Sequence, residues 1–166
     1  PEEIAGVALS GQMMGCLCID KKGNPLSPHL LYCDQRSQEE EAFLYEKMDP
    51  LHFYEITGHR ISASYSIEKL MWIRKHMPEV FAKTYKMLNA KDYINVRLCG
   101  TIATDPSDAS GTNAYDLNRW SWSEEIIQAA GLVISLIPEV RSSIDVIAEV
   151  TEEAAKATGH RNGTPV

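Results

Sequence analysis

Residues 6–20, GVALSGQMMGCLCID, restrict the fold of this chain more than any other stretch. The apolar runs at 4–9 and 16–20 are typical of two buried β-strands. Between them stands SGQMMG (10–15), in which a glutamine and two flexible methionines are enclosed by glycines. An ordinary connection would carry Asn, Asp, Pro and charged residues instead. This turn is therefore the first candidate contact site in the chain.

Turn and capping signals divide the next sixty residues into short elements. DKKGNP after the second apolar run indicates a hairpin turn, and a third strand is expected over 30–33. Ser37 and Glu40 have capping-box spacing, so a helix should begin there and end at the Asp49-Pro50 pair.

Helical signals dominate from Ser66 onward. One face of the first helix collects Ile67, Leu70, Met71 and Ile73, and the Pro78 break is expected to be followed by more helix over 79–88. Further helices are predicted over 89–99, 124–131 and 152–158, with 101–122 as a long loop and Val166 opening a new strand. Strands first and helices later favour a layered α/β or α+β architecture.

The charge of the chain argues against anionic partners. Sixteen basic and 23 acidic residues give a formal net charge of −7, which repels a phosphate backbone or an anionic membrane surface. We expect no nucleic-acid and no membrane partner. The longest apolar stretch, IIQAAGLVISLIP, is also shorter than the about 20 residues that cross a bilayer. With no targeting segment recognised, a cytoplasmic protein is expected.

Cysteines and histidines carry no strong catalytic or metal signal. Cys16, Cys18, Cys33 and Cys99 lie in apolar runs without zinc-ligand spacing, so reduced, buried thiols are predicted. The five histidines are scattered, and each is expected to be a surface or hydrogen-bonded side chain. Phosphate-binding glycine loops, nucleophile elbows and His-Glu-x-x-His pairs are absent from the sequence.

The second candidate site is LLYCDQRS, where an apolar run delivers Tyr32, Asp34 and Arg36 at its carboxyl end. In open α/β sheets ligands bind at that end of the strands. A carboxylate accepts a hydrogen bond from a hydroxyl, and an aromatic ring can stack on the apolar face of a sugar. An Asp34–Arg36 surface pair, or an anchor for the helix after Ser37, explains the same residues equally well.

Six segments in chain order carry a resemblance to a known family. They read SGQMMG, YCDQRS, SYSIEKLMWIRKH, AKDYINVRLCG, TDPSDASGT and ATGHRNGTPV. Together they cover nearly the whole chain, which resembles the N-terminal domain of the FGGY carbohydrate kinases and is most similar to xylulokinases. Segment 64–76 is similar to the family's first signature through Ser66, Lys69, Trp72 and Ile73.

The resemblance implies an α/β, RNase H-like (actin-like ATPase) fold in two domains, with residues 1–166 as a segment of the N-terminal sugar-binding domain. In the family, ATP lies in the cleft between the domains, Mg²⁺ neutralises its phosphates, and a carboxylate is the general base. By position, Gln12, Met13 and Met14 form the turn that meets the sugar. Tyr32 stands where the family has an aromatic residue beside the sugar, and Asp34 matches the aspartate that follows.

Two of these positions depart from the family pattern. Met14 replaces a common histidine, so one hydrogen bond to a sugar hydroxyl is lost, at a cost of roughly 1 to 3 kcal/mol, and substrate preference is expected to change. Tyr32 replaces a tryptophan but keeps a ring face. For Lys91 and Asp92 we expect a helix-start pair that holds loop to helix, with direct sugar contact as the alternative, and Asp108 and Ser110 are expected to bond loop backbone at the cleft rim.

The resemblance puts other family motifs outside residues 1–166. A phosphate-binding Asp-Leu-Gly-Thr-Ser type strand is expected before Pro1, and the Gly-rich loop with the catalytic base is expected after Val166. We therefore expect no catalytic residue, no metal ligand and no ATP contact in this chain, which alone should phosphorylate no sugar. We also expect an isolated segment to form a homo-oligomer through exposed apolar surface.

Three functions stay open at this point. The leading one is the sugar-binding part of an ATP-dependent kinase for a ketopentose such as xylulose. A kinase for another sugar or sugar acid, such as ribulose or gluconate, differs only in the sugar site. A non-catalytic sugar-binding or interaction module could keep the fold alone. An Asp-bearing, glycine-rich loop after Val166 would distinguish the kinases from the module.

Overall fold

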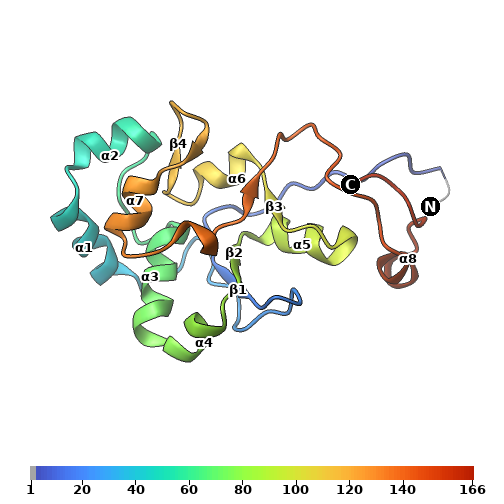
Figure 1. Ribbon diagram of the computed structural model, residues 1–166, viewed down its shortest axis with the longest axis horizontal. Helices are drawn as coiled ribbons and strands as arrows, with labels where there is room; N and C mark the ends of the chain where they lie inside the picture. The colour runs from blue at the N-terminus through green and yellow to red at the C-terminus, as the bar shows by residue number, and fades with distance from the viewer. Residues whose placement is uncertain (1–2) are drawn as a thin grey trace.

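The structure is a computed structural model that describes residues 3–166; Pro1 and Glu2, at the expected cut before the first strand, lie outside the described residues. Short strands alternate with helices (Figure 1). In chain order the elements are β1 (Leu17–Ile19), α1 (Gln38–Lys47), α2 (Pro50–Thr57), α3 (Ser66–His76), α4 (Pro78–Lys83), β2 (Lys86–Leu88), α5 (Ala90–Cys99), β3 (Ala103–Thr104), α6 (Pro106–Ser110), β4 (Tyr115–Asp116), β5 (Ser121–Trp122), α7 (Glu124–Ala129), the 3₁₀ helix η1 (Ile134–Leu136), β6 (Glu139–Val140) and α8 (Glu152–Thr158).

Three two-stranded ladders connect distant parts of the chain. β1 and β2 are antiparallel with Cys18 opposite Met87, and β4 and β5 are antiparallel with Tyr115 opposite Trp122. β3 and β6 are parallel, with Ala103 opposite Glu139. Because β1 directly follows the turn at 11–15, its pairing with β2 fixes one end of that turn against the start of α5.

The main core surrounds α3, whose predicted apolar face is confirmed. Ile67, Leu70, Met71 and Ile73 are buried and pack with Leu44 of α1, as well as with residues of α2 and α7. The packing density of such a core makes α3 a rigid support for the loops at its first turn. Figure 1 shows α1, α2, α3 and α7 gathered at one end of the molecule, with α8 at the other.

Capping residues explain several helix boundaries. Asn89 and Asp92 form a reciprocal capping box at the start of α5, and Gly100 ends that helix in the left-handed region, with φ 76°. Thr151 caps α8, which Gly159 ends with φ 79°. The predicted ends of both helices are confirmed.

Two predicted strands and one predicted helix cap near the N-terminal end are wrong, although the helix itself is present as α1. Residues 4–9, all described, form no ladder, although the Val7 amide donates to the Pro165 carbonyl at 2.8 Å. The predicted strand at 30–33 is reduced to one bridge between Leu30 and Cys16. Ser37 precedes α1 without a side-chain capping bond, because its backbone, at ψ 27°, lacks the extended conformation of a capping residue.

Two further predictions fail because tertiary pairing replaces local propensity. Helix α4 stops at Lys83, and residues 86–88 pair with β1 as a strand instead of continuing the predicted helix 79–88. The predicted loop 101–122 contains β3, α6, β4 and β5. Elements of two to five residues are too short to show a sequence period. Among residues 3–166, no helix is both long and apolar enough to cross a membrane.

Candidate functional site

The first predicted contact site is a strained turn, which we call the methionine turn (residues 11–15). Met14 has φ 65°, one of the few non-glycine residues of the described chain in the left-handed region. That conformation costs an L-residue about 1–2 kcal/mol. The surrounding structure must therefore hold the turn in place.

Two buried polar side chains hold the end of the methionine turn. The ammonium group of Lys69, on α3, donates to the Met14 carbonyl at 3.1 Å. The side-chain oxygen of Asn89, before α5, accepts from the Gly15 amide at 3.1 Å. The peptide group between Met14 and Gly15 is thus bonded on both of its polar atoms.

Close packing fixes the rest of the turn. A methyl group added to Gly11 would lie 3.2 Å from Lys91 Cβ, and one added to Gly111 would lie 3.1 Å from both Met13 Cβ and Met13 Cε. A methyl group on Gly15 would overlap the His29 ring. The three glycines therefore allow Lys91 of α5, the end of α6 and His29 to lie close to the methionine turn.

The second predicted site, residues 32–36, contains the Asp34–Arg36 pair that was the alternative interpretation of these residues. Arg36 binds both carboxylate oxygens of Asp34, with Nε at 2.9 Å from each, and its guanidinium lies 4.7 Å from the Trp72 ring centre. The Arg36 hydrogen bond lowers the pKa of the Asp34 carboxyl. Tyr32 is half exposed, with 52% of its surface accessible. Arg36 thus favours the ionised form of Asp34 and fixes the orientation of its carboxylate.

Lys69 lies between the two predicted sites. Besides the Met14 carbonyl, its ammonium group donates to the Ser64 carbonyl, and Gln35 binds the Ser64 hydroxyl at 2.6 Å. Burial lowers the pKa of Lys69, whereas the charge of Asp34 is among those that raise it. Lys69 therefore binds the methionine turn directly and reaches the 32–36 segment through Ser64 and Gln35. The signature match in 64–76 includes this lysine, but no sequence pattern disclosed its two carbonyl partners.

Lys91 forms the centre of a carboxylate cluster beneath the turn. Its ammonium group lies 2.7 Å from Asp92, 3.3 Å from Asp105 and 3.4 Å from Asp108. Burial raises the pKa of Asp92 to about 6 and also raises the pKa of Asp108. The expected structural role of Lys91 and Asp92 is confirmed, since this cluster ties α5 to the start of α6.

The predicted backbone contacts of Asp108 and Ser110 are wrong. The Asp108 carboxylate faces Lys91, and the Ser110 hydroxyl lies 3.0 Å from His59 Nε2. The other ring nitrogen of His59 lies 3.2 Å from the Tyr65 hydroxyl, and burial lowers the pKa of the ring. Sequence reasoning missed this chain of three groups because His59 and Ser110 are 51 positions apart.

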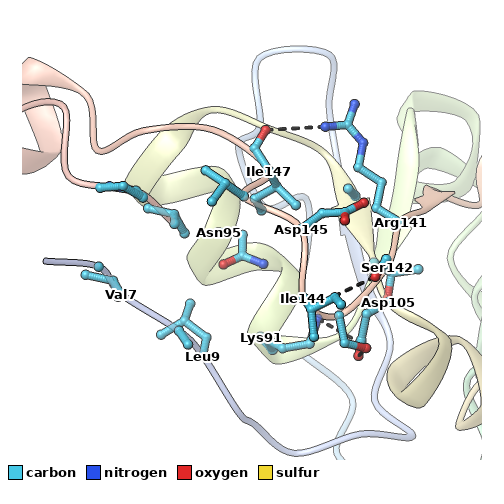
Figure 2. Close-up of a pocket in the computed structure, with 18 residues that line it drawn as sticks. Val7, Leu9, Lys91, Asn95, Asp105, Arg141, Ser142, Ile144, Asp145 and Ile147 are labelled. Carbon is cyan, nitrogen blue, oxygen red and sulfur yellow. Dashed lines mark hydrogen bonds and ion pairs between the residues drawn. The ribbon is translucent and has the colours of Figure 1, made fainter.

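A hollow of about 440 Å³ opens beside the start of the methionine turn. Figure 2 shows Val7 and Leu9 on one side of it, with Lys91 and Asn95 of α5 facing the segment that carries Ile144. None of the five predicted sugar-contact residues lines this hollow. The predicted site is therefore a separate surface, next to the hollow in sequence and joined to it through Lys91.

One group of side chains has the spacing of metal ligands. Glu39, Glu40 and His76 offer ligand atoms within 4.8 Å of one another at the contact of α1 with α3. Glu39 is already paired with Lys75 at 2.5 Å, so part of its charge is neutralised there. This group lies on helices that carry none of the predicted sugar-contact residues.

The cysteines differ in one case from their predicted burial. All four thiols are free, and Cys16, Cys18 and Cys99 are buried as predicted. Cys33 is exposed, because residues 31–36 form turns rather than the expected buried strand. Its exposed thiol lies between Tyr32 and Asp34 in the sequence.

A comparison with known families decides between the open interpretations of the fold. The family model for the N-terminal domain of the FGGY family of carbohydrate kinases matches residues 1–166. The chain belongs to this family. The curated relatives of this FGGY chain include the xylulose kinase of Klebsiella pneumoniae, 34% identical over 154 residues, and that of Bacillus subtilis, 32% identical over 165 residues.

Solved structures give the same result for the fold of the FGGY chain. The xylulose kinase from Rhodospirillum rubrum matches 98% of the chain with a TM-score of 0.93 and 29% identity. The gluconate kinase from Lactobacillus acidophilus matches 97% of it with a TM-score of 0.88, but at 24% identity it shows the fold alone. The predicted α/β fold of the actin-like ATPase type is confirmed. The chain spans about a third of these proteins, 33% of the Rhodospirillum chain and 32% of the Klebsiella relative.

Proposed function

We propose that this FGGY chain is the sugar-binding part of an ATP-dependent carbohydrate kinase that acts on a ketopentose such as xylulose. The observation that carries the proposal is the methionine turn, held in a strained conformation by the buried side chains of Lys69 and Asn89. Strain of this kind is common at ligand sites, where the surrounding structure must maintain it. The relatives named xylulose kinase support the choice of sugar.

Each proposed contact residue has a separate chemical task. The amide of Gln12 can donate to and accept from sugar hydroxyls, and the Met13 and Met14 side chains can contact the apolar C–H groups. The exposed ring of Tyr32 offers a stacking surface. The Asp34 carboxylate, although paired with Arg36, keeps lone pairs that can accept from a hydroxyl.

The proposal assigns ATP and Mg²⁺ to the protein but no contact with them to residues 3–166. When bound, ATP supplies the phosphoryl group that the sugar hydroxyl receives. Asp92, Asp105 and Asp108 are the clustered carboxylates next to the turn, and Lys91 already occupies the space between them. Mg²⁺ needs open oxygen donors in octahedral geometry, so this cluster does not fit the ion.

A kinase for a different sugar is the second candidate, favoured by Met14. A methionine cannot replace the hydrogen bond of the histidine that the xylulokinase resemblance predicts at this position. Ribulose or gluconate would then be a better substrate than xylulose. A cytoplasmic location, without nucleic-acid or membrane partners, is part of the proposal in either case.

The test is sugar-dependent ADP release by the protein expressed from its complete gene. The panel contains xylulose, ribulose, gluconate and glycerol, and we expect the highest kcat/KM with xylulose. If ribulose or gluconate gives the highest kcat/KM, the second candidate is supported. If no sugar stimulates ADP release while sugar binding is measurable, a non-catalytic binding module replaces the kinase proposal. Residues 1–166 alone should release no ADP with any of the four.

A further inference from the structure

We propose that Lys69 is a positioning residue that joins the two halves of the sugar site and sets sugar affinity without touching the sugar. The two halves are the methionine turn and the 32–36 segment. This inference rests on the proposed function for its effect on affinity. Its structural part, the control of the turn by Lys69, stands on the geometry alone.

The contacts of Lys69 reach both halves from the first turn of α3. Its ammonium group donates to the Met14 carbonyl at 3.1 Å and to the Ser64 carbonyl. Ser64 is bound in turn by Gln35 of the 32–36 segment, with the amide nitrogen 2.6 Å from the hydroxyl. Lys69 therefore binds one half directly and is linked to the other half through Ser64.

Burial makes this link strong and specific. Lys69 is among the largest fully buried side chains of the described chain, on a helix packed into the main core. An uncompensated buried cation is costly, so its hydrogen bonds to carbonyl groups cannot be given up without a structural change. A surface lysine would make weaker and more mobile contacts.

The turn needs such an anchor because Met14 is left-handed. With φ 65°, the Met14 backbone relaxes toward an ordinary conformation unless its carbonyl is held. The first turn of α3 also supports the neighbouring loop. There the Glu68 carboxylate accepts a hydrogen bond from the side chain of Asn113, whose backbone has φ 67°. Successive residues of one helix thus support two strained residues on loops that meet at Met13 and Gly111.

The variant that tests this inference is Lys69→Met in the protein expressed from its complete gene. Methionine keeps most of the buried stem and removes the donor. We expect the KM for the sugar to rise between about tenfold and about 100-fold, the penalty typical of misplaced binding groups, with the KM for ATP unchanged within about twofold. Lys69→Arg, which keeps a cationic donor, should recover part of the loss.

Lys86→Met is the matched control. Lys86 is partly buried and, like Lys69, donates to a backbone carbonyl, that of Ile137 at 2.8 Å, but none of its hydrogen bonds or ion pairs among the described residues reaches either half of the site. Lys86→Met should lower Tm and leave the sugar KM unchanged. If Lys69→Met and Lys86→Met give the same sugar KM, Lys69 has only a structural role and the inference is wrong.

A second measurement tests the geometry without any activity. The ¹³C-methyl NMR signals of Met13 and Met14 should shift in Lys69→Met and stay unchanged in Lys86→Met, with no sugar present. Unmoved signals in Lys69→Met would overturn the inference even in an active kinase. Failure of the kinase proposal would instead appear as wild-type protein that phosphorylates no sugar, whatever the NMR signals show.

Discussion

At the scale of single residues, the backbone of Met14 matters as much as its side chain. Asparagine is several-fold enriched among non-glycine residues in the left-handed region, whereas β-branched residues rarely adopt it. We expect Met14→Val to lower the free energy of unfolding by about 1–2 kcal/mol more than Met14→Asn does. Both variants shorten the side chain, and subtracting the difference between the same two changes at Met13 leaves the cost of φ 65°.

Urea denaturation of the two variants measures this difference. Met13→Val and Met13→Asn form the control pair, since Met13 is not among the described residues with positive φ. Met13→Val should be at least as stable to urea as Met13→Asn. Equal stabilities for Met14→Val and Met14→Asn would show that the turn is not held in the left-handed conformation in solution.

At the scale of elements, α3 carries a buried acid as well as a buried base. Burial raises the pKa of Glu68 to about 8, from an ordinary value of 4.5. Between about pH 4.5 and about pH 8 the folded protein therefore holds a proton on Glu68 that the unfolded chain has lost. Because the folded state binds more protons, the free energy of unfolding falls as pH rises through this interval.

Glu68→Gln should remove that pH dependence. Glutamine stays neutral and can still accept from the Asn113 side chain, which lies 3.0 Å from the Glu68 carboxylate. The stability of the wild type relative to Glu68→Gln should therefore decrease between about pH 4.5 and about pH 8 and stay constant outside this range. Chemical denaturation at several pH values measures it. A difference independent of pH would mean that Glu68 is ionised when folded.

The same elements show how far sequence reasoning reaches. The buried face of α3 and the ends of α5 and α8 were predictable, because periodicity and glycine caps are local signals. The pairing of 86–88 with β1 depends on residues about 70 positions away, and no local signal encodes it. The two candidate sites were recognised from the residues themselves, and the family resemblance assigned the proposed contact residues to a sugar. The carbonyl partners of Lys69 could not be predicted, since every residue has a backbone carbonyl and the sequence does not show which one is bonded.

At the scale of the whole molecule, apolar side chains are exposed beside the hollow of Figure 2. Ile144 is 92% exposed and Val146 is 66% exposed, both on the segment that lines that hollow. Exposed apolar patches favour association. We expect isolated residues 1–166 to self-associate, and Ile144→Asp with Val146→Asp to weaken that association by at least about tenfold.

Sedimentation velocity at several concentrations measures the association. The control is Leu51→Asp, because Leu51 is as exposed as Val146, at 66%, but lies on α2 at the far end of the molecule (Figure 1). The Leu51→Asp change should leave the association constant unchanged. A monomer at all concentrations, or equal effects of the two changes, would show that this patch does not drive self-association.

The central claim, that the methionine turn contacts the sugar, is tested most directly by the sugar preference of Met14→His. We would measure the ratio of kcat/KM for xylulose to kcat/KM for ribulose in the protein expressed from its complete gene. A histidine that bonds a sugar hydroxyl should change this ratio by about fivefold to about 150-fold, the equivalent of about 1 to 3 kcal/mol. Met77→His, on a methionine between α3 and α4, is the control and should not change it. A ratio that is the same in wild type, Met14→His and Met77→His would contradict the claim.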